Sequence, residues 1–115
     1  MEINFKHIEE ENIVIVFPSG SFEMEDSAYF EKTVSDIISE TKTKKLLLNM
    51  SMLEYLNSTA LNLFIGVYNR LLKSGIRIVF CSLSKPVETL FNITSLKLLV
   101  PIYPTEWDAI QYLKK

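Results

Sequence analysis

Hydrophobic positions follow two different spacings along the chain, and the spacing changes from one segment to the next. Ile13–Phe17 and Leu46–Leu48 are unbroken apolar runs, whereas the apolar residues from Ser58 to Ser74 recur every three or four positions. An unbroken run is typical of a strand covered on both faces, and the wider spacing is typical of a helix with one apolar side. The pattern therefore predicts strands that alternate with helices.

Nine elements follow from this pattern, in the order ββαβαβαβα. Strands are expected at Ile3–Ile8, Ile13–Phe17, Leu46–Leu48, Arg77–Cys81 and Val100–Tyr103, and helices after Asp26, from Ser58 to Ser74, after Ser84 and after Thr105. The turn Pro18–Gly20 is expected to end the second strand, and Gly75 to end the longest helix. This alternation predicts an α/β fold, with a mostly parallel central sheet, right-handed crossovers and about four flanking helices. The first strand should join by a hairpin as an antiparallel edge, and the Leu47 strand should lie inside the sheet.

Length and composition predict one domain over residues 1–115 with a well-formed core, since the chain has 115 residues of which 48% are apolar. The net charge is −2 and no basic stripe is present, which argues against a nucleic-acid partner. The N-terminus lacks the features of a signal peptide, and no apolar stretch has the ~18 residues of a membrane span. We therefore expect a cytoplasmic protein without direct membrane insertion.

The residues that usually carry catalysis are scarce. Cys81 is the only cysteine and His7 the only histidine, and the chain contains no phosphate-binding glycine loop and no zinc-binding HExxH motif. Cys81 closes an apolar run, which predicts a buried and inert thiol. We therefore expect no catalytic residue, no metal site, no cofactor and no enzymatic activity.

One segment, Leu46–Leu61, combines a buried strand, a short apolar loop and the start of the longest helix. Its polar residues are Asn57, Ser58 and Thr59, at the point where the helix opens. Asn57 and Ser58 are both residue types that accept a hydrogen bond from the first turn of a helix. The residues alone therefore predict a helix cap, at either of these two positions.

The same segment resembles the signature of STAS domains, in particular the bacterial anti-sigma factor antagonists. That signature has Asp-Leu-Ser at a strand end and Asp-Ser-x-Gly-Leu at a helix start, where this chain has Asn49–Ser51 and Asn57–Leu61. Further similarities, in the family's order, are found at Ser19–Glu23, Lys73–Gly75, Ile93–Leu96 and Ile102–Ala109. Three positions depart from the signature, because amides replace the two acids at Asn49 and Asn57 and Ala60 replaces the glycine. Ala60 is bulkier than glycine on a surface that a kinase would approach.

The resemblance implies a regulatory function. A family member of this kind binds an anti-sigma factor of the serine-kinase type, releases a sigma factor, and is switched off by phosphorylation until a phosphatase restores it. The acceptor implied here is Ser58, with Thr59 as a weaker candidate. The alternative is a non-phosphorylated STAS interaction subunit of an ABC-type lipid-transport complex or of a stress-signalling assembly.

The expected partner surface lies at one end of the sheet, because right-handed crossovers bring the relevant loops together there. It comprises the Ser19–Glu23 loop, the Met52–Tyr55 loop and the start of the Ser58 helix. The individual residues are Ser19, Gly20, Ser21, Glu23, Met52, Tyr55, Asn57, Ser58, Thr59 and Asn62. The apolar residues Met50, Met52 and Leu53 fit either a contact patch or the core.

Overall fold

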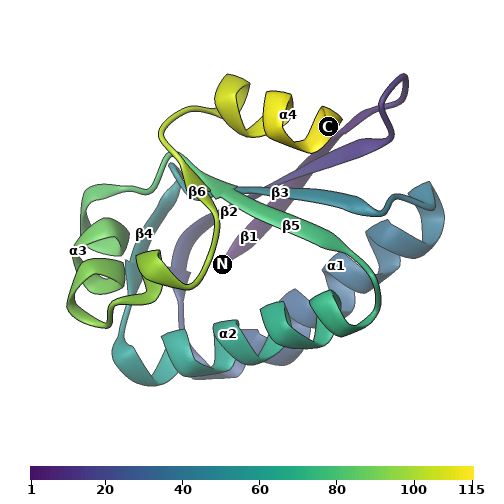
Figure 1. Ribbon diagram of the computed structural model, residues 1–115. Coiled ribbons are helices and arrows are strands. Elements are labelled where there is room, and N and C mark those ends of the chain that lie inside the picture. The colour runs from purple at the N-terminus through teal and green to yellow at the C-terminus, as the bar shows by residue number, and fades with distance from the viewer.

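The computed structural model describes residues 1–115 as a six-stranded mixed sheet between helices. The strands are β1 (Glu2–Ile8), β2 (Ile13–Phe22), β3 (Lys45–Asn49), β4 (Leu53–Leu56), β5 (Arg77–Cys81) and β6 (Ile102–Tyr103). The α-helices are α1 (Ser27–Thr41), α2 (Ser58–Lys73), α3 (Lys85–Ile93) and α4 (Glu106–Lys114), and the short 3-10 helices are η1 (Met24–Asp26) and η2 (Leu96–Leu98). Helices α1 and α2 cover one face of the sheet, α4 lies on the other face, and α3 lies beside β4 (Figure 1).

The sheet has the order β1-β2-β3-β5-β6, and β4 pairs with β2 outside this path. β1 is antiparallel to β2, whereas every other pair of strands is parallel. β3 lies between β2 and β5, and Leu46–Leu48 are fully or almost fully buried. The predicted fold class is therefore confirmed, including the antiparallel N-terminal edge and the inner position of the Leu47 strand.

β2 is longer than predicted, and the expectation that Pro18–Gly20 would end it was wrong. The backbone N–H of Gly20 donates to the carbonyl of Met52 at 3.1 Å, on the edge of β2 away from β1. Because alternate residues of a strand present their N–H groups to the same edge, the nitrogen of Pro18 faces that edge too. Pairing with β3 ends at Val16 and pairing with β4 begins at Gly20. The missing N–H of Pro18 therefore falls in a gap between two partners and costs no ladder bond.

β4 occupies a segment that was predicted to be a loop, and its presence corrects the predicted order by one strand. It runs parallel to β2, with a register shift between Gly20 and Ser21. The ends of the strand, Leu53 and Leu56, are buried, whereas the two residues between them are exposed. This burial pattern does not follow the two-residue alternation of a regular strand, because the irregular pairing displaces one residue. The sequence alone therefore gave no strand signal here.

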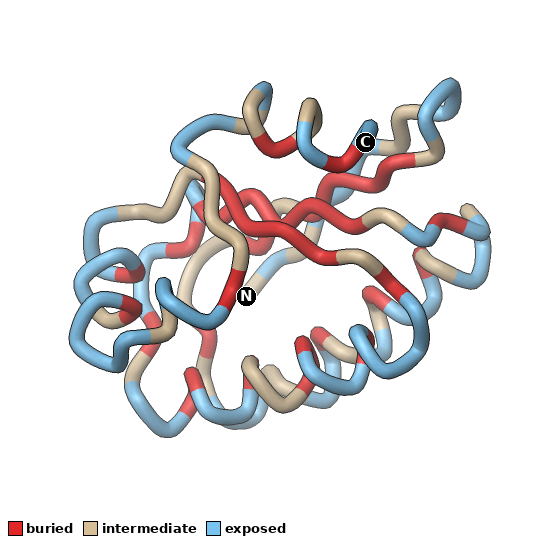
Figure 2. The backbone as a smooth tube through the Cα atoms, viewed as in Figure 1, coloured by how far each residue is buried: buried red, intermediate tan, exposed pale blue.

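The core has one cluster on each face of the sheet, and Figure 2 shows the buried stretches along the central strands and on the inner sides of the helices. The larger cluster, under α1 and α2, contains the mutually packed rings of Phe22, Phe30 and Phe64, with centroids 5.1 to 5.8 Å apart. Phe64 continues this contact to Phe80 at 6.0 Å. The smaller cluster lies under α4 and includes Cys81, which is fully buried as predicted. Burial raises the pKa of the Cys81 thiol.

An ion pair joins the two helices that cover the larger cluster. The Nε and Nη2 atoms of Arg70 on α2 each donate to a carboxylate oxygen of Glu31 on α1, both at 2.7 Å. These hydrogen bonds lower the pKa of Glu31. The bidentate geometry fixes how the two helices face one another.

Asp26, Ser84 and Thr105 are residue types that commonly cap a helix, but only Thr105 caps the helix that follows it. The Asp26 carboxylate accepts from the backbone N–H of Glu23 at 2.7 Å and does not cap α1. The Ser84 hydroxyl donates to the carbonyl of Leu53 at 2.6 Å, so it ties α3 to β4 and does not cap α3. Thr105 does cap α4, accepting from the N–H of Asp108 at 3.1 Å. Gly75 follows α2 at φ 87°, as expected for the residue that ends this helix.

Candidate partner-binding site

The pairing of β2 with β4 brings together the two segments that were predicted to be neighbouring loops. Gly20 lies opposite Leu53, and Ser21 lies opposite Tyr55. The segment from Ser19 to Ser21 and the segment from Met52 to Tyr55 are therefore held side by side by strand pairing and not by loop contacts. The predicted neighbourhood is present, but two paired strands form it in place of two loops.

Glu23 and the start of α2 lie at the same end of the molecule. Glu23 directly precedes η1, which packs against both α1 and α2. β4 leads directly into α2 through Asn57. Strand ends and helix starts meet here because the carboxyl ends of parallel strands share one end of an α/β sheet.

The apolar residues of this region divide clearly between core and surface. Met50 and Leu53 are 0% and 1% exposed, so both belong to the larger core cluster. Met52 and Tyr55 are 57% and 48% exposed. Exposed methionine and tyrosine side chains are typical of protein contact surfaces, so these two residues remain candidates for partner binding.

Asn57, and not Ser58, caps α2. Its side-chain oxygen accepts from the backbone N–H of Ala60 at 2.8 Å, and its carbonyl accepts from the N–H of Leu61 at 2.8 Å. Ser58 is the first residue of the helix and is exposed. The structure thereby separates the two capping alternatives, and the cap does not use the Ser58 hydroxyl.

The rest of the first turns of α2 alternates between surface and core. Thr59 and Asn62 are exposed beside Ser58, whereas Ala60 and Leu61 are 0% and 2% exposed. The expectation that Ala60 would stand on the surface a kinase approaches was therefore wrong, because its methyl group packs into the core. The first turn of α2 contains no acidic residue, so no side chain there offsets the positive end of the helix dipole.

Asn49 holds the end of β3 in place with both ends of its amide. The Nδ2 group donates to Oε1 of Glu106 on α4 at 2.9 Å, and Oδ1 accepts from the N–H and the hydroxyl of Ser51 at 3.0 and 2.7 Å. The side chain is buried, and all of its polar atoms find partners. An aspartate here would place a second carboxylate against Glu106, so the amide at this position matches the surroundings that this chain provides.

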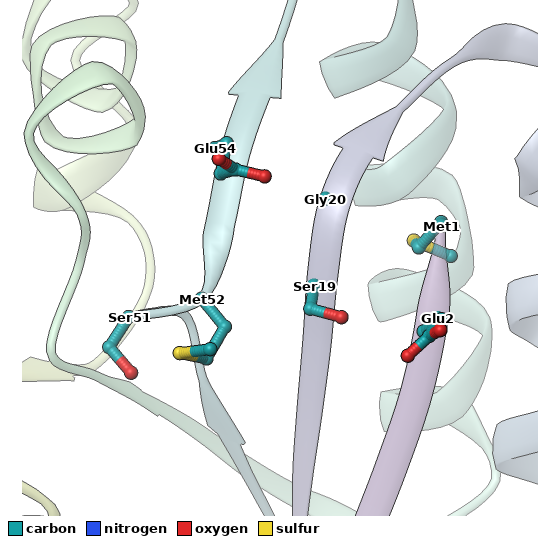
Figure 3. A pocket seen from close by; sticks show the side chains of 7 residues that line it. All are labelled: Met1, Glu2, Ser19, Gly20, Ser51, Met52 and Glu54. Carbon is teal, nitrogen blue, oxygen red and sulfur yellow. The ribbon is translucent and has the colours of Figure 1, made fainter.

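An open cavity of about 560 Å³ lies over β2, between the start of β1 and β4. Its lining residues are Met1, Glu2, Ser19, Gly20, Ser51, Met52 and Glu54 (Figure 3). Ser19, Gly20 and Met52 were named for the predicted partner surface, and Glu54 lies within its Met52–Tyr55 segment. Met1, Glu2 and Ser51 were not predicted. Only the folded sheet brings Met1 and Glu2, the first residues of the chain, near β4. Ser58 does not line this cavity.

The sequence profile described as the STAS domain matches residues 4–109. The chain belongs to the STAS domain family. It is 23% identical to the anti-sigma F factor antagonist of Paenibacillus polymyxa over 114 residues. These aligned residues make up 99% of this chain and 96% of the relative. The similarity to this relative therefore extends over almost the whole of both chains.

Solved structures support the same fold. An anti-sigma factor antagonist from Mycobacterium paratuberculosis has a TM-score of 0.77 at 20% identity, over 99% of this chain and 96% of that one. The anti-sigma factor antagonist SpoIIAA in its unphosphorylated form has a TM-score of 0.73 at 17% identity, over 98% and 96% of the two chains. The Bacillus protein SpoIIAA in its phosphorylated form has a TM-score of 0.67 at 17% identity, over 97% and 99%. None of the helices of this STAS domain has the length and apolar character needed to cross a membrane.

The cap predicts that Asn57→Ala destabilises the domain by about 0.5–2 kcal/mol, because the N–H of Ala60 loses its acceptor. Ser58→Ala is the matched control and should change the free energy of unfolding by less than about 0.5 kcal/mol, since its hydroxyl is exposed. Urea denaturation of the three proteins measures both effects. Equal losses in the two variants would show that Asn57 is not the cap.

The Asn49–Glu106 contact predicts that Asn49→Asp destabilises the domain by about 1–3 kcal/mol at pH 7, because the amide that donates to Glu106 becomes a carboxylate at a buried position. Two adjacent carboxylates raise the pKa of one of them. When folding raises the pKa of a carboxyl, the free energy of unfolding falls as the pH rises. The loss of stability in Asn49→Asp should therefore shrink as the pH falls towards about 4.

The matched variant for this experiment is Asn49→Asp combined with Glu106→Gln, in which the new amide can donate to the new carboxylate. This double variant should regain most of the lost stability at pH 7 in chemical denaturation. A deficit that is independent of pH and persists in the double variant would contradict the assignment.

Proposed function

We propose that this STAS domain, residues 1–115, acts in the cytoplasm as an anti-sigma factor antagonist that is released from its partner by phosphorylation of Ser58. The observation that carries the proposal is the exposed Ser58 hydroxyl at the first position of α2, left free because Asn57 supplies the cap. The name of the Paenibacillus relative supports the binding function. The existence of SpoIIAA in phosphorylated and unphosphorylated forms supports the switch.

The proposed modification is compatible with the fold. A phosphate on Ser58 adds about −1.5 to −2 charges. At the start of a helix such a charge is favoured by about 0.3–1 kcal/mol, and no acidic residue of the first turn opposes it. Ala60, which faces the core, is not displaced by a group on the exposed side of the turn. Phosphorylation should therefore leave the domain folded.

The effect of the phosphate is instead exerted on the partner. The proposed contact surface is formed by Ser19, Gly20, Ser21, Glu23, Met52, Tyr55, Asn57, Ser58, Thr59 and Asn62. Met52 and Tyr55 would supply its apolar contacts. Inside an interface, an uncompensated dianion costs about 2–5 kcal/mol. This cost corresponds to a loss of affinity by a factor of about 30 to several thousand.

The proposed partner is an anti-sigma factor of the serine-kinase type, and a phosphatase would reset the switch. The proposal describes a binding protein and not an enzyme. The amides Asn49 and Asn57 are built into hydrogen bonds of the fold. An aspartate at position 49 could not donate to Glu106, whereas an aspartate at position 57 could still accept from the Ala60 N–H, so the hydrogen bonds explain the amide at Asn49 only. Ser58 itself stays exposed with both amides in place.

Ser58→Asp is expected to weaken capture of the partner while leaving the melting temperature within a few degrees of the parent, because the added charge stands at an exposed helix start. Affinity purification from the source organism, with wild type and variant as bait, measures the first effect, and thermal unfolding measures the second. Ser35→Asp is the matched control, since Ser35 is an exposed serine on α1 outside the proposed surface.

The identity of the captured protein decides between the two functions. A serine kinase that is lost with Ser58→Asp and retained with Ser35→Asp supports the proposal. Capture of an ABC-transporter ATPase or of a stress-signalling assembly, unaffected by Ser58→Asp, would establish the non-phosphorylated alternative. Unfolding of Ser58→Asp would contradict the interface mechanism.

The captured kinase and ATP should add one phosphate to the wild-type domain, as measured by intact mass, because Ser58 presents an exposed hydroxyl at the first position of α2. Ser58→Ala should accept none, and Thr59→Ala should accept one. The reverse result for these two variants would move the acceptor to Thr59. No phosphate on any of the proteins would identify a non-phosphorylated STAS domain.

A further inference from the structure

β1 is an edge strand whose outer side is free. It pairs with β2 over its whole length, from Glu2 opposite Ser19 to Ile8 opposite Ile13, without a register shift. No strand occupies its other edge. β1 contains neither a proline nor a bulge, two of the devices that prevent an edge from pairing, and of the third device, charged side chains, it carries Glu2 and Lys6. A seven-residue edge of this kind is a template for a further strand.

The side chains of β1 are complementary to a second copy of themselves. From Glu2 to Lys6 the strand reads acid, apolar, amide, apolar, base, which is symmetric in polarity and opposite in charge about Asn4. In an antiparallel pair centred on Asn4, Glu2 lies opposite Lys6 of the second copy and Ile3 lies opposite its Phe5. Opposite-charge and apolar pairs directly opposite one another both stabilise antiparallel strand pairing. A two-fold axis makes every such pair twice.

The surface beside this edge carries exposed aromatic side chains. Phe5 is 46% exposed and Tyr29 on α1 is 51% exposed. Glu31 faces α2 through Arg70, and Tyr29, two residues earlier, lies about 200° around the helix from it. Tyr29 therefore lies on the side of α1 away from α2, and α1 itself contacts β1 and β2. A chain added to the edge would cover apolar surface as well as form backbone hydrogen bonds.

We propose that two copies of this chain associate through their β1 strands, antiparallel about Asn4, to form one continuous sheet across a two-fold axis. This inference is independent of the proposed function. β4 lies across β2 from β1 (Figure 3), and α2 follows β4. The pairing therefore leaves Ser58 of both copies accessible.

A charge-swap cycle tests the register. Glu2 and Lys6 are exposed, so Glu2→Lys and Lys6→Glu should fold normally while each places like charges opposite one another. Sedimentation velocity over a concentration series should show a wild-type dimer and at least a tenfold rise in its dissociation constant for either single variant. The double variant Glu2→Lys/Lys6→Glu should restore the dimer. Lys44→Glu, at an exposed position outside β1, is the control for net charge and should have no effect.

A second measurement places a thiol on the proposed axis. Asn4→Cys should form a disulfide-linked dimer under mild oxidation, because the only other cysteine, Cys81, is buried. Ser35→Cys should not. The proposal is overturned by a wild-type monomer at concentrations up to about 1 mM, by a dimer that is insensitive to the charge swap, or by equal cross-linking of the two cysteine variants.

Discussion

β2 is bonded along both of its edges, with β1 on one side and first β3, then β4, on the other. The change of partner from β3 to β4 on a single edge requires an interruption, and Pro18 occupies it because a residue without an N–H loses nothing there. Beyond the interruption, β4 is held parallel to β2 and delivers the chain to the start of α2. The position of Asn57 and Ser58 therefore depends on the second half of β2, although the two segments are far apart in the sequence.

Local patterns predicted the parts of the fold that local physics determines. The apolar runs at Leu46–Leu48 and Arg77–Cys81 are buried strands, and the helical spacing after Ser58 ends at Gly75, where a positive φ is required. The failures lie where a tertiary contact decides. β4 needs β2 as its partner, and its register shift removes the alternation by which a strand is recognised. Similarly, Ser84 and Asp26 look like caps in the sequence, but in the fold each serves a different backbone group.

In the candidate site, too, the sequence predicted some features, whereas others depend on tertiary contacts. Sequence similarity to the family named the candidate residues, and the pairing of β2 with β4 brings two of the chain segments that carry them side by side. Which of them are surface and which are core could not be predicted. Met52 is exposed beside buried Leu53, and Ala60 is buried beside exposed Thr59. Likewise, the cap could be assigned to Asn57 only once the position of the Ala60 N–H was known.

The cap on α2 also limits which enzymes can act at its first residue. Ser58 has a helical backbone. The Asn57 cap precedes it in the chain, and the buried side chains of Ala60 and Leu61 hold the same turn against the core. An enzyme that reads its substrate as an extended peptide would have to unwind this turn and expose those core residues. A kinase that modifies Ser58 must therefore recognise the folded surface. Selectivity would then depend on the shape that the whole domain presents and not on a short linear motif, and an unfolded chain would be a poor substrate.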